Sequence, residues 1–218
     1  MNINMEIRMT AMRETQIYKE AAQVDNRLSS IKLKKEPLLT IRTMALGAGA
    51  DATPFHASNA EGTFTYHIGL FALRKEHVGA IWKVDRSNGI DSIRNDQDRV
   101  KVVFSNVDIA CSDGKKPKPR SAKGAGAERL CSENDMFGGL PHFAPAQPSS
   151  DKGWTVYYLM VAPNGAAELS RPIVKDKIFK AFVERIYLSD GSDFGVEPKS
   201  LLDDDIADSF DPQIIRKK

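Results

Sequence analysis

The sequence has few of the residues and segments that mark specialised protein classes. Two cysteines in 218 residues are too few for a disulfide framework. No apolar run approaches the roughly 18 residues that a membrane-spanning helix needs, and the first residues lack the apolar core of a secretory signal. We therefore expect a cytoplasmic protein without a membrane partner, long enough to form one domain with appendages.

Signatures of catalysis and of cofactor binding are also missing. The glycines between Gly47 and Gly62 are not followed by the Gly-Lys-Ser/Thr of a phosphate-binding loop. Cys111 and Cys131 flank a polar segment with too few nearby histidines for a zinc site, so free thiols are expected. The sequence therefore indicates no cofactor, no metal site and no catalytic residue, and it favours a non-enzymatic protein without deciding the question.

The charges are unevenly distributed, although the formal net charge is only +2. Residues 113–129 carry six basic and two acidic side chains, whereas residues 190–211 carry eight acidic and one basic side chain. Blocks of like charge are usually solvated and often mark segments that interact with a partner.

Apolar spacing predicts the elements of the first half of the chain. Residues 11–31 show a helical stripe, which either packs on the main domain or pairs with a second copy of itself. Pro37 is expected to end this helix. After Pro37, Leu38–Leu46 is expected to form a strand, and alternation of apolar and polar residues predicts further strands at Thr63–Arg74, Val78–Asp85 and Arg99–Cys111.

Residues 112–153 differ from their surroundings because proline and glycine are scattered through them. A loop of about 40 residues is far longer than usual, and such loops tend to be functional or disordered. After it, Trp154–Ala162 reads as a central buried strand that turns at Asn164-Gly165 into a second strand. Residues 178–188 fit a helix or a strand, with the helix slightly favoured.

Together these patterns predict an α+β fold that is rich in β-structure. We expect an antiparallel sheet or a small, partly open barrel, with an amphipathic N-terminal helix. The expected organisation is a helical arm (1–36), a core domain (37–190) and an acidic tail (191–218).

The leading functional hypothesis is a non-catalytic protein that binds nucleic acid, most simply single-stranded DNA or RNA. Clustered lysine and arginine residues suit the phosphate backbone, and aromatic rings stack on unpaired bases. The acidic tail would then occupy the basic segment, residues 113–129, in the absence of ligand, or it would recruit partners. The candidate binding residues are Lys115, Lys116, Lys118, Arg120, Lys123, Arg129, Phe137, Phe143 and Trp154.

Two alternatives stay open at this point. An adaptor or assembly subunit would form a homo-oligomer, or bind a protein partner, through residues 11–31 or 195–218. A metal-dependent nuclease would need converging carboxylates near Lys101. The acidic residues available for such a site are Asp85, Asp91, Asp96 and Asp98.

Overall fold

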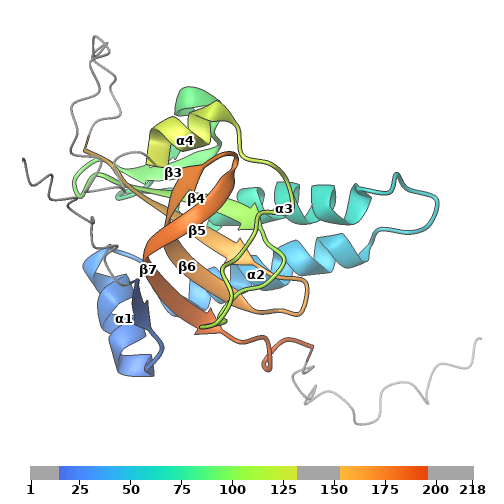
Figure 1. The fold of residues 1–218 in the computed structure, drawn as a ribbon, viewed down its shortest axis with the longest axis horizontal. Coiled ribbons are helices and arrows are strands. Elements are labelled where there is room, and N and C mark those ends of the chain that lie inside the picture. Colours follow the sequence, from blue (N-terminus) through green and yellow to red (C-terminus); the bar gives the residue numbers. More distant parts are fainter. Residues whose placement is uncertain (1–14, 132–152, 196–218) are drawn as a thin grey trace, which may run out of the picture.

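The protein has an α+β fold built on one open, seven-stranded mixed sheet (Figure 1). The computed structural model describes residues 15–131 and 153–195. The strands are β1 (Gln16–Tyr18), β2 (Lys83–Asp85), β3 (Ser92–Asn95), β4 (Val100–Asn106), β5 (Thr155–Val161), β6 (Ala167–Lys175) and β7 (Ile178–Ser189). The helices are α1 (Ala21–Ser30), α2 (Lys35–Ala50), α3 (Ala60–His77) and α4 (Ala125–Cys131), with a short 3-10 turn η1 (Ser87–Gly89).

The strand order is β1-β7-β6-β5-β4-β3-β2, which places β5 at the centre of the sheet. The pairs β1–β7 and β4–β5 are parallel, and every other neighbouring pair is antiparallel. The predicted β-rich α+β class and the central position of the Trp154–Ala162 run are thus confirmed.

Helices α1, α2 and α3 cover one face of the sheet and form the larger core. Helix α3 approaches β4 closely at Gly69, where an added Cβ would lie 2.3 Å from the Phe104 ring. The hairpin of α2 and α3 extends beyond the sheet and ends in the loop 51–59 (Figure 1).

The other face of the sheet is covered by the segment that connects β4 to β5. Adjacent parallel strands cannot be joined by a tight turn, so the chain must cross the sheet between them. Val107, Ala127 and Leu130 of this connection pack into a second core against β5, β6 and β7. The predicted long loop at 112–153 therefore has a topological cause, and its described part contains helix α4.

Two predicted strands are helices in the structure. Leu38–Leu46 lies within α2, which buries Leu38, Ile41 and Ala45 at helical spacing. Pro37 stands in the first turn of α2, where a missing N–H costs no hydrogen bond, so it marks the beginning of a helix and not an end. Thr63–Arg74 lies within α3, because contacts with β4 and α2 outweigh its alternating pattern.

Three other predicted boundaries also change. Of the expected strand Val78–Asp85, only the last three residues form one, β2. The strand predicted to continue to Cys111 ends at Asn106. Residues 178–188, for which a helix was slightly favoured, form β7; register shifts against β6 break the period of two and produce a helix-like spacing.

The N-terminal amphipathic helix is present but shorter than predicted. It covers Ala21–Ser30, and residues 16–18 before it form the edge strand β1. Its apolar stripe, Val24, Leu28 and Ile31, is buried in the larger core. The stripe therefore packs on the chain's own sheet, as the first of the two interpretations expected.

Candidate nucleic-acid interface

A buried ion pair anchors the basic segment to the sheet. Arg185 of β7 and Glu168 of β6 form two hydrogen bonds of 2.9 and 2.6 Å, and their side chains are 4% and 0% exposed. Glu168 also accepts a hydrogen bond from the Cys111 backbone N–H, and Arg185 donates to the Ser112 carbonyl oxygen. The chain after Cys111 is thus held against the sheet while Lys115, Lys116 and Lys118 remain exposed.

The hairpin between β6 and β7 adds three lysines to this surface. Asp176 and Lys177 form a two-residue turn in which both residues have positive φ. Exposed lysines precede, occupy and follow the turn: Lys175, Lys177 and Lys180. The sequence prediction did not include them.

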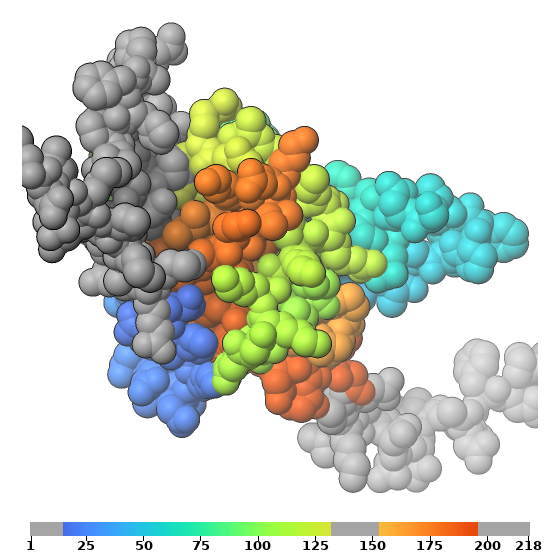
Figure 2. Space-filling model, viewed as in Figure 1, coloured from blue at the N-terminus to red at the C-terminus, as the bar shows by residue number. Residues whose placement is uncertain are grey.

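Two hydrogen bonds place the basic segment beside this hairpin. Lys116 Nζ donates to the Lys180 carbonyl oxygen at 3.3 Å, and the Lys123 backbone N–H donates to the Lys177 carbonyl oxygen at 2.9 Å. Both segments lie on the same side of the space-filling molecule (Figure 2). We call this surface the basic face, formed by Lys115, Lys116, Lys118, Arg120, Lys175, Lys177 and Lys180.

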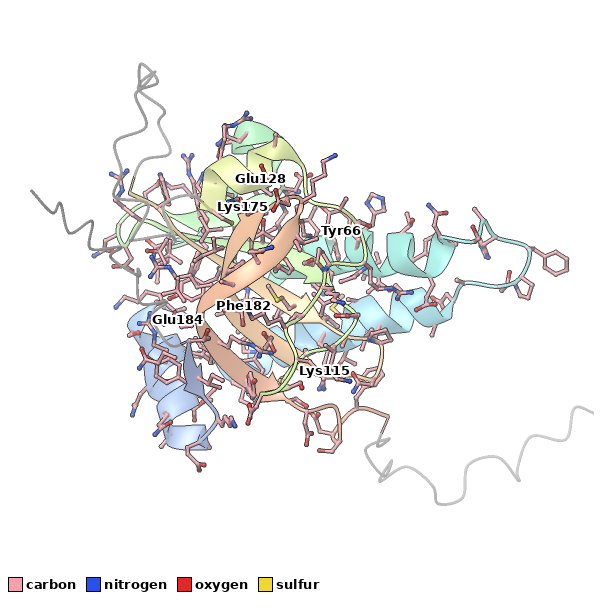
Figure 3. All side chains as sticks on the ribbon, viewed as in Figure 1. Tyr66, Lys115, Glu128, Lys175, Phe182 and Glu184 are labelled. Carbon is pink, nitrogen blue, oxygen red and sulfur yellow. The ribbon has the colours of Figure 1, made fainter. Side chains whose placement is uncertain are left out.

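The lysines of the basic face form no ion pairs in the described structure, although the Glu128 and Asp108 carboxylates accept hydrogen bonds from the backbone N–H groups of Lys177 and Lys118. Within the described residues, Arg120 is the one member of the face with a carboxylate in ion-pair distance, its partner being Glu61. Asp113, in the same segment, is engaged by Lys19, and Asp176 lies in the hairpin turn. Lys115 and Lys175 lie toward opposite ends of the surface (Figure 3). The face therefore presents an extended positive strip to an anionic partner.

The remaining predicted binding residues have different environments. Trp154 is only 9% exposed, and its ring is covered by Lys101 and Arg99, whose charged groups lie 5.0 and 5.5 Å from the ring centre. It belongs to the core and is not available for base stacking. Arg129 is exposed on α4, and Phe137 and Phe143 lie outside the described residues.

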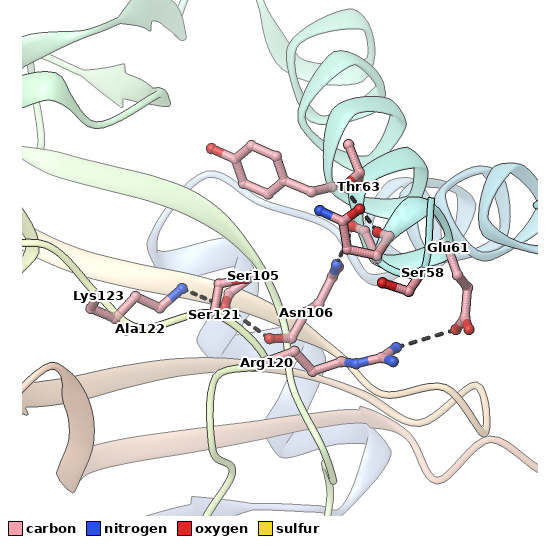
Figure 4. A pocket seen from close by; sticks show the side chains of 12 residues that line it. Ser58, Glu61, Thr63, Ser105, Asn106, Arg120, Ser121, Ala122 and Lys123 are labelled. Atoms are coloured by element: carbon pink, nitrogen blue, oxygen red, sulfur yellow. Dashed lines mark hydrogen bonds and ion pairs between the residues drawn. The ribbon is translucent and has the colours of Figure 1, made fainter. Parts of the chain in front are cut away.

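A pocket of about 460 Å³ adjoins the basic face between the beginning of α3 and the end of β4 (Figure 4). Lys123 and Arg120 line one side, and Glu61 and Tyr66 of α3 line the other. A second hollow of about 260 Å³ continues from it and shares Tyr66, Ala122 and Lys123. The pocket thus connects two cations of the basic segment with an aromatic ring.

Lys123 is more enclosed than the other lysines of the segment. Its Nζ donates a 2.7 Å hydrogen bond to Ser105 Oγ and lies 5.4 and 5.3 Å from the ring centres of Tyr158 and Phe179. Burial without a carboxylate partner lowers the pKa of its ammonium group to about 8. Lys123 therefore remains mostly charged at neutral pH, at the cost of partial desolvation.

The carboxylates considered for a nuclease site are engaged by neighbouring side chains. Asp85 pairs with Lys101 at 3.0 Å and with Arg94 at 3.4 Å, whereas Asp91 pairs with Arg74 at 2.7 Å. Asp96 pairs with Lys83 and Arg94, and Asp98 accepts a hydrogen bond from the Asn95 side chain. In residues 15–131 and 153–195, no group of three or more His, Cys, Asp or Glu side chains is placed to hold a metal ion.

Both cysteines are free thiols inside the fold. Cys131 is buried in the second core and Cys111 is partly buried beside Glu168. Burial raises the pKa of each thiol to about 12, so neither is a thiolate at neutral pH.

The lysines of the β6–β7 hairpin were missed because their turn lacks the usual sequence signal. Asp-Lys occupies the two positive-φ positions where Asn-Gly is favoured. The remaining sequence indication of a hairpin is that the apolar residues Val174 and Phe179, which pair across the two strands, flank the turn.

Comparison with protein-family models, with curated proteins and with solved structures finds no match to this chain. None of the described helices combines the length and the apolar character that crossing a bilayer would require.

Proposed function

We propose that this protein binds nucleic acid through the basic face and does not cleave it. The observation that carries the proposal is the convergence of two basic segments, residues 115–120 and residues 175–180, on one surface. Nucleic-acid binding draws much of its affinity from lysine and arginine side chains that replace the counterions of the phosphates. Six exposed lysines without a carboxylate partner in the described structure suit that task.

Single-stranded DNA or RNA is the ligand that this arrangement favours. The lysines lie on a crossover segment and a hairpin, and the described helices contribute only Arg129 beside them. Duplex readers more often place a helix in the major groove. A two-stranded ribbon can also enter that groove, so duplex DNA is the essential comparison.

The proposal is tested by fluorescence anisotropy of labelled single-stranded DNA, duplex DNA and RNA over a salt series, with and without magnesium. We expect salt-sensitive binding, tightest for a single strand, and intact ligand after incubation with magnesium. A logarithmic slope of about −0.7 per phosphate contact is the signature of counterion release from single strands. The absence of binding at low salt would refute the proposal, and magnesium-dependent cleavage would replace it with the nuclease alternative.

One observation favours assembly as a second candidate function. The hairpin of α2 and α3 projects from the sheet (Figure 1). Its loop contains Phe55, whose side chain is fully exposed. An aromatic residue at such a position is typical of an anchor that enters a pocket on a partner. Light scattering of the wild type and of Phe55→Ser tests this candidate. If Phe55 anchors an assembly of copies of this chain, the wild type has a mass greater than that of one chain, and the Phe55→Ser variant has the mass of one chain.

A further inference from the structure

Lys123 is a recessed cation whose bonding capacity the described residues do not satisfy. An ammonium group has three donors, and Ser105 Oγ is the one hydrogen-bond acceptor that Lys123 Nζ meets among the described residues. A desolvated charge without a counter-ion is unfavourable. An anion that entered the pocket would supply the missing acceptors and the opposite charge.

Arg120 provides a second cation at the same pocket. Its guanidinium group donates a single 3.2 Å hydrogen bond to Glu61, and the two side chains are 40% and 55% exposed (Figure 4). An ion pair this exposed contributes little free energy, so Arg120 can exchange Glu61 for a ligand oxygen. The Arg120 backbone N–H is bound to the Asn106 carbonyl oxygen at 3.1 Å, which fixes the base of the side chain.

Asn106 also lines the pocket, where its Nδ2 donates to the Gly62 carbonyl oxygen at 2.8 Å and so ties the end of β4 to the beginning of α3. Tyr66, shared by both hollows, offers a ring on which a base can pack.

We infer that this pocket binds the phosphate monoester of a nucleotide, with the phosphate between Lys123 and Arg120. The inference rests on the proposed function in one respect: the nucleotide would be the phosphorylated end of a strand held on the basic face. Lys123 is recessed, so a phosphate within a strand reaches it only if the backbone bends inward, whereas a terminal phosphate can enter directly. A free mononucleotide has the same chemistry and is the other possible source.

The pH dependence follows from Lys123, which must be protonated to bind the phosphate. Its pKa is about 8, so affinity for a terminal phosphate should fall roughly tenfold per pH unit above that value. The neighbouring Cys131 and Tyr158 have raised pKa values and stay neutral there, as does Tyr66. The carboxylates that line the two hollows are paired, Glu61 with Arg120 and Asp91 with Arg74.

The experiment compares single strands of about ten nucleotides, within the usual site size of such proteins. They carry a 5′-phosphate, a 3′-phosphate or hydroxyls at both ends, and a nucleoside monophosphate and inorganic phosphate are titrated separately. We expect one phosphorylated end to bind about tenfold more tightly than the hydroxyl end, the effect of one or two charged hydrogen bonds. Lys123→Met keeps the length and ring packing of the side chain and should abolish this preference; Arg120→Gln should reduce it.

Lys175→Gln is the matched control, because it removes a charge from the basic face outside the pocket. It should weaken all strands equally and leave the preference for a phosphorylated end unchanged. Equal affinity of the wild type for phosphorylated and hydroxyl ends would overturn the strand-end site while leaving the proposed function intact. If no strand binds, the proposed function fails, and the monophosphate titration decides the pocket: binding that Lys123→Met abolishes supports it, and no binding overturns it.

Discussion

Lys116 Nζ donates a hydrogen bond to the carbonyl oxygen of Lys180, across 64 positions of sequence. This contact joins the crossover segment to the β6–β7 hairpin and brings two groups of lysines onto one surface. Like charges repel each other, so such clustering lowers stability unless other contacts hold the segments in place. The Glu168–Arg185 pair and the backbone bond from Lys123 to Lys177 hold these two segments together.

The buried pair is therefore expected to be important for both stability and binding. Glu168→Ala leaves Arg185 charged and buried without its partner, which should cost about 3–5 kcal/mol of unfolding free energy. The Cys111 backbone N–H loses its acceptor at the same time. Urea unfolding of Glu168→Ala, of Arg185→Ala and of the double variant Glu168→Ala/Arg185→Ala measures the effect. The double variant should lose less than the sum of the single variants; strict additivity would contradict a coupled pair.

The close contact of α3 with β4 predicts opposite effects at two helical glycines. Gly69→Ala places a methyl group against the Phe104 ring and should destabilise the protein by about 1–3 kcal/mol. Gly47 of α2 has no neighbouring atom within 4 Å of an added Cβ, so Gly47→Ala should stabilise by about 0.5–1 kcal/mol through helix propensity. Thermal unfolding of the two variants distinguishes them, and a shift of the same sign in both would contradict the described packing.

Arg42 and Asp193 predict a pH dependence of stability. Buried Arg42 of α2 binds both carboxylate oxygens of Asp193, at 2.8 and 3.0 Å, and this hydrogen bonding lowers the Asp193 pKa to about 2. The stabilisation is present above the ordinary value of 3.8 and is lost as the pH falls toward 2. Because the carboxylate is 47% exposed, we expect Asp193→Asn to cost only roughly 1 kcal/mol at neutral pH.

The measurement is the unfolding free energy of the wild type and of Asp193→Asn between pH 7 and pH 2. The difference between the two proteins should be constant down to about pH 4 and should then disappear. A difference that persists unchanged at the lowest pH would show that the substitution acts through something other than the charge of Asp193.

The sequence predicted those parts of the fold whose signals are local. The apolar run of β5 and the turn at Asn164-Gly165 were both recognised, and Gly165 has the positive φ (87°) that the turn residues indicated. Helix α3 was not recognised because its residues alternate in sequence, and α2 was also predicted as a strand; the surfaces that both helices bury are set by α2–α3 packing and by β4. Gly49, for example, fits against Thr65 of the facing helix.

The candidate site was predictable only in part for the same reason. The charge density of residues 115–123 is visible in the sequence, but the partner lysines 175–180 join it only after β6 and β7 pair. The enclosure of Lys123 depends on Tyr158 and Phe179, which come from two distant strands. Trp154 illustrates the opposite error. It was predicted to stack on bases because it follows the basic segment in sequence, but its side chain is part of the core.

The most direct test of the basic face replaces the three hairpin lysines, Lys175, Lys177 and Lys180, with glutamine and measures single-strand binding over a salt series. We predict weaker binding and a logarithmic salt slope that is less steep by about 2, or about 0.7 for each lost phosphate contact. The control replaces three exposed lysines outside the face: Lys32, Lys34 and Lys75. Affinity and slope equal to those of the wild type in the hairpin variant would contradict the account.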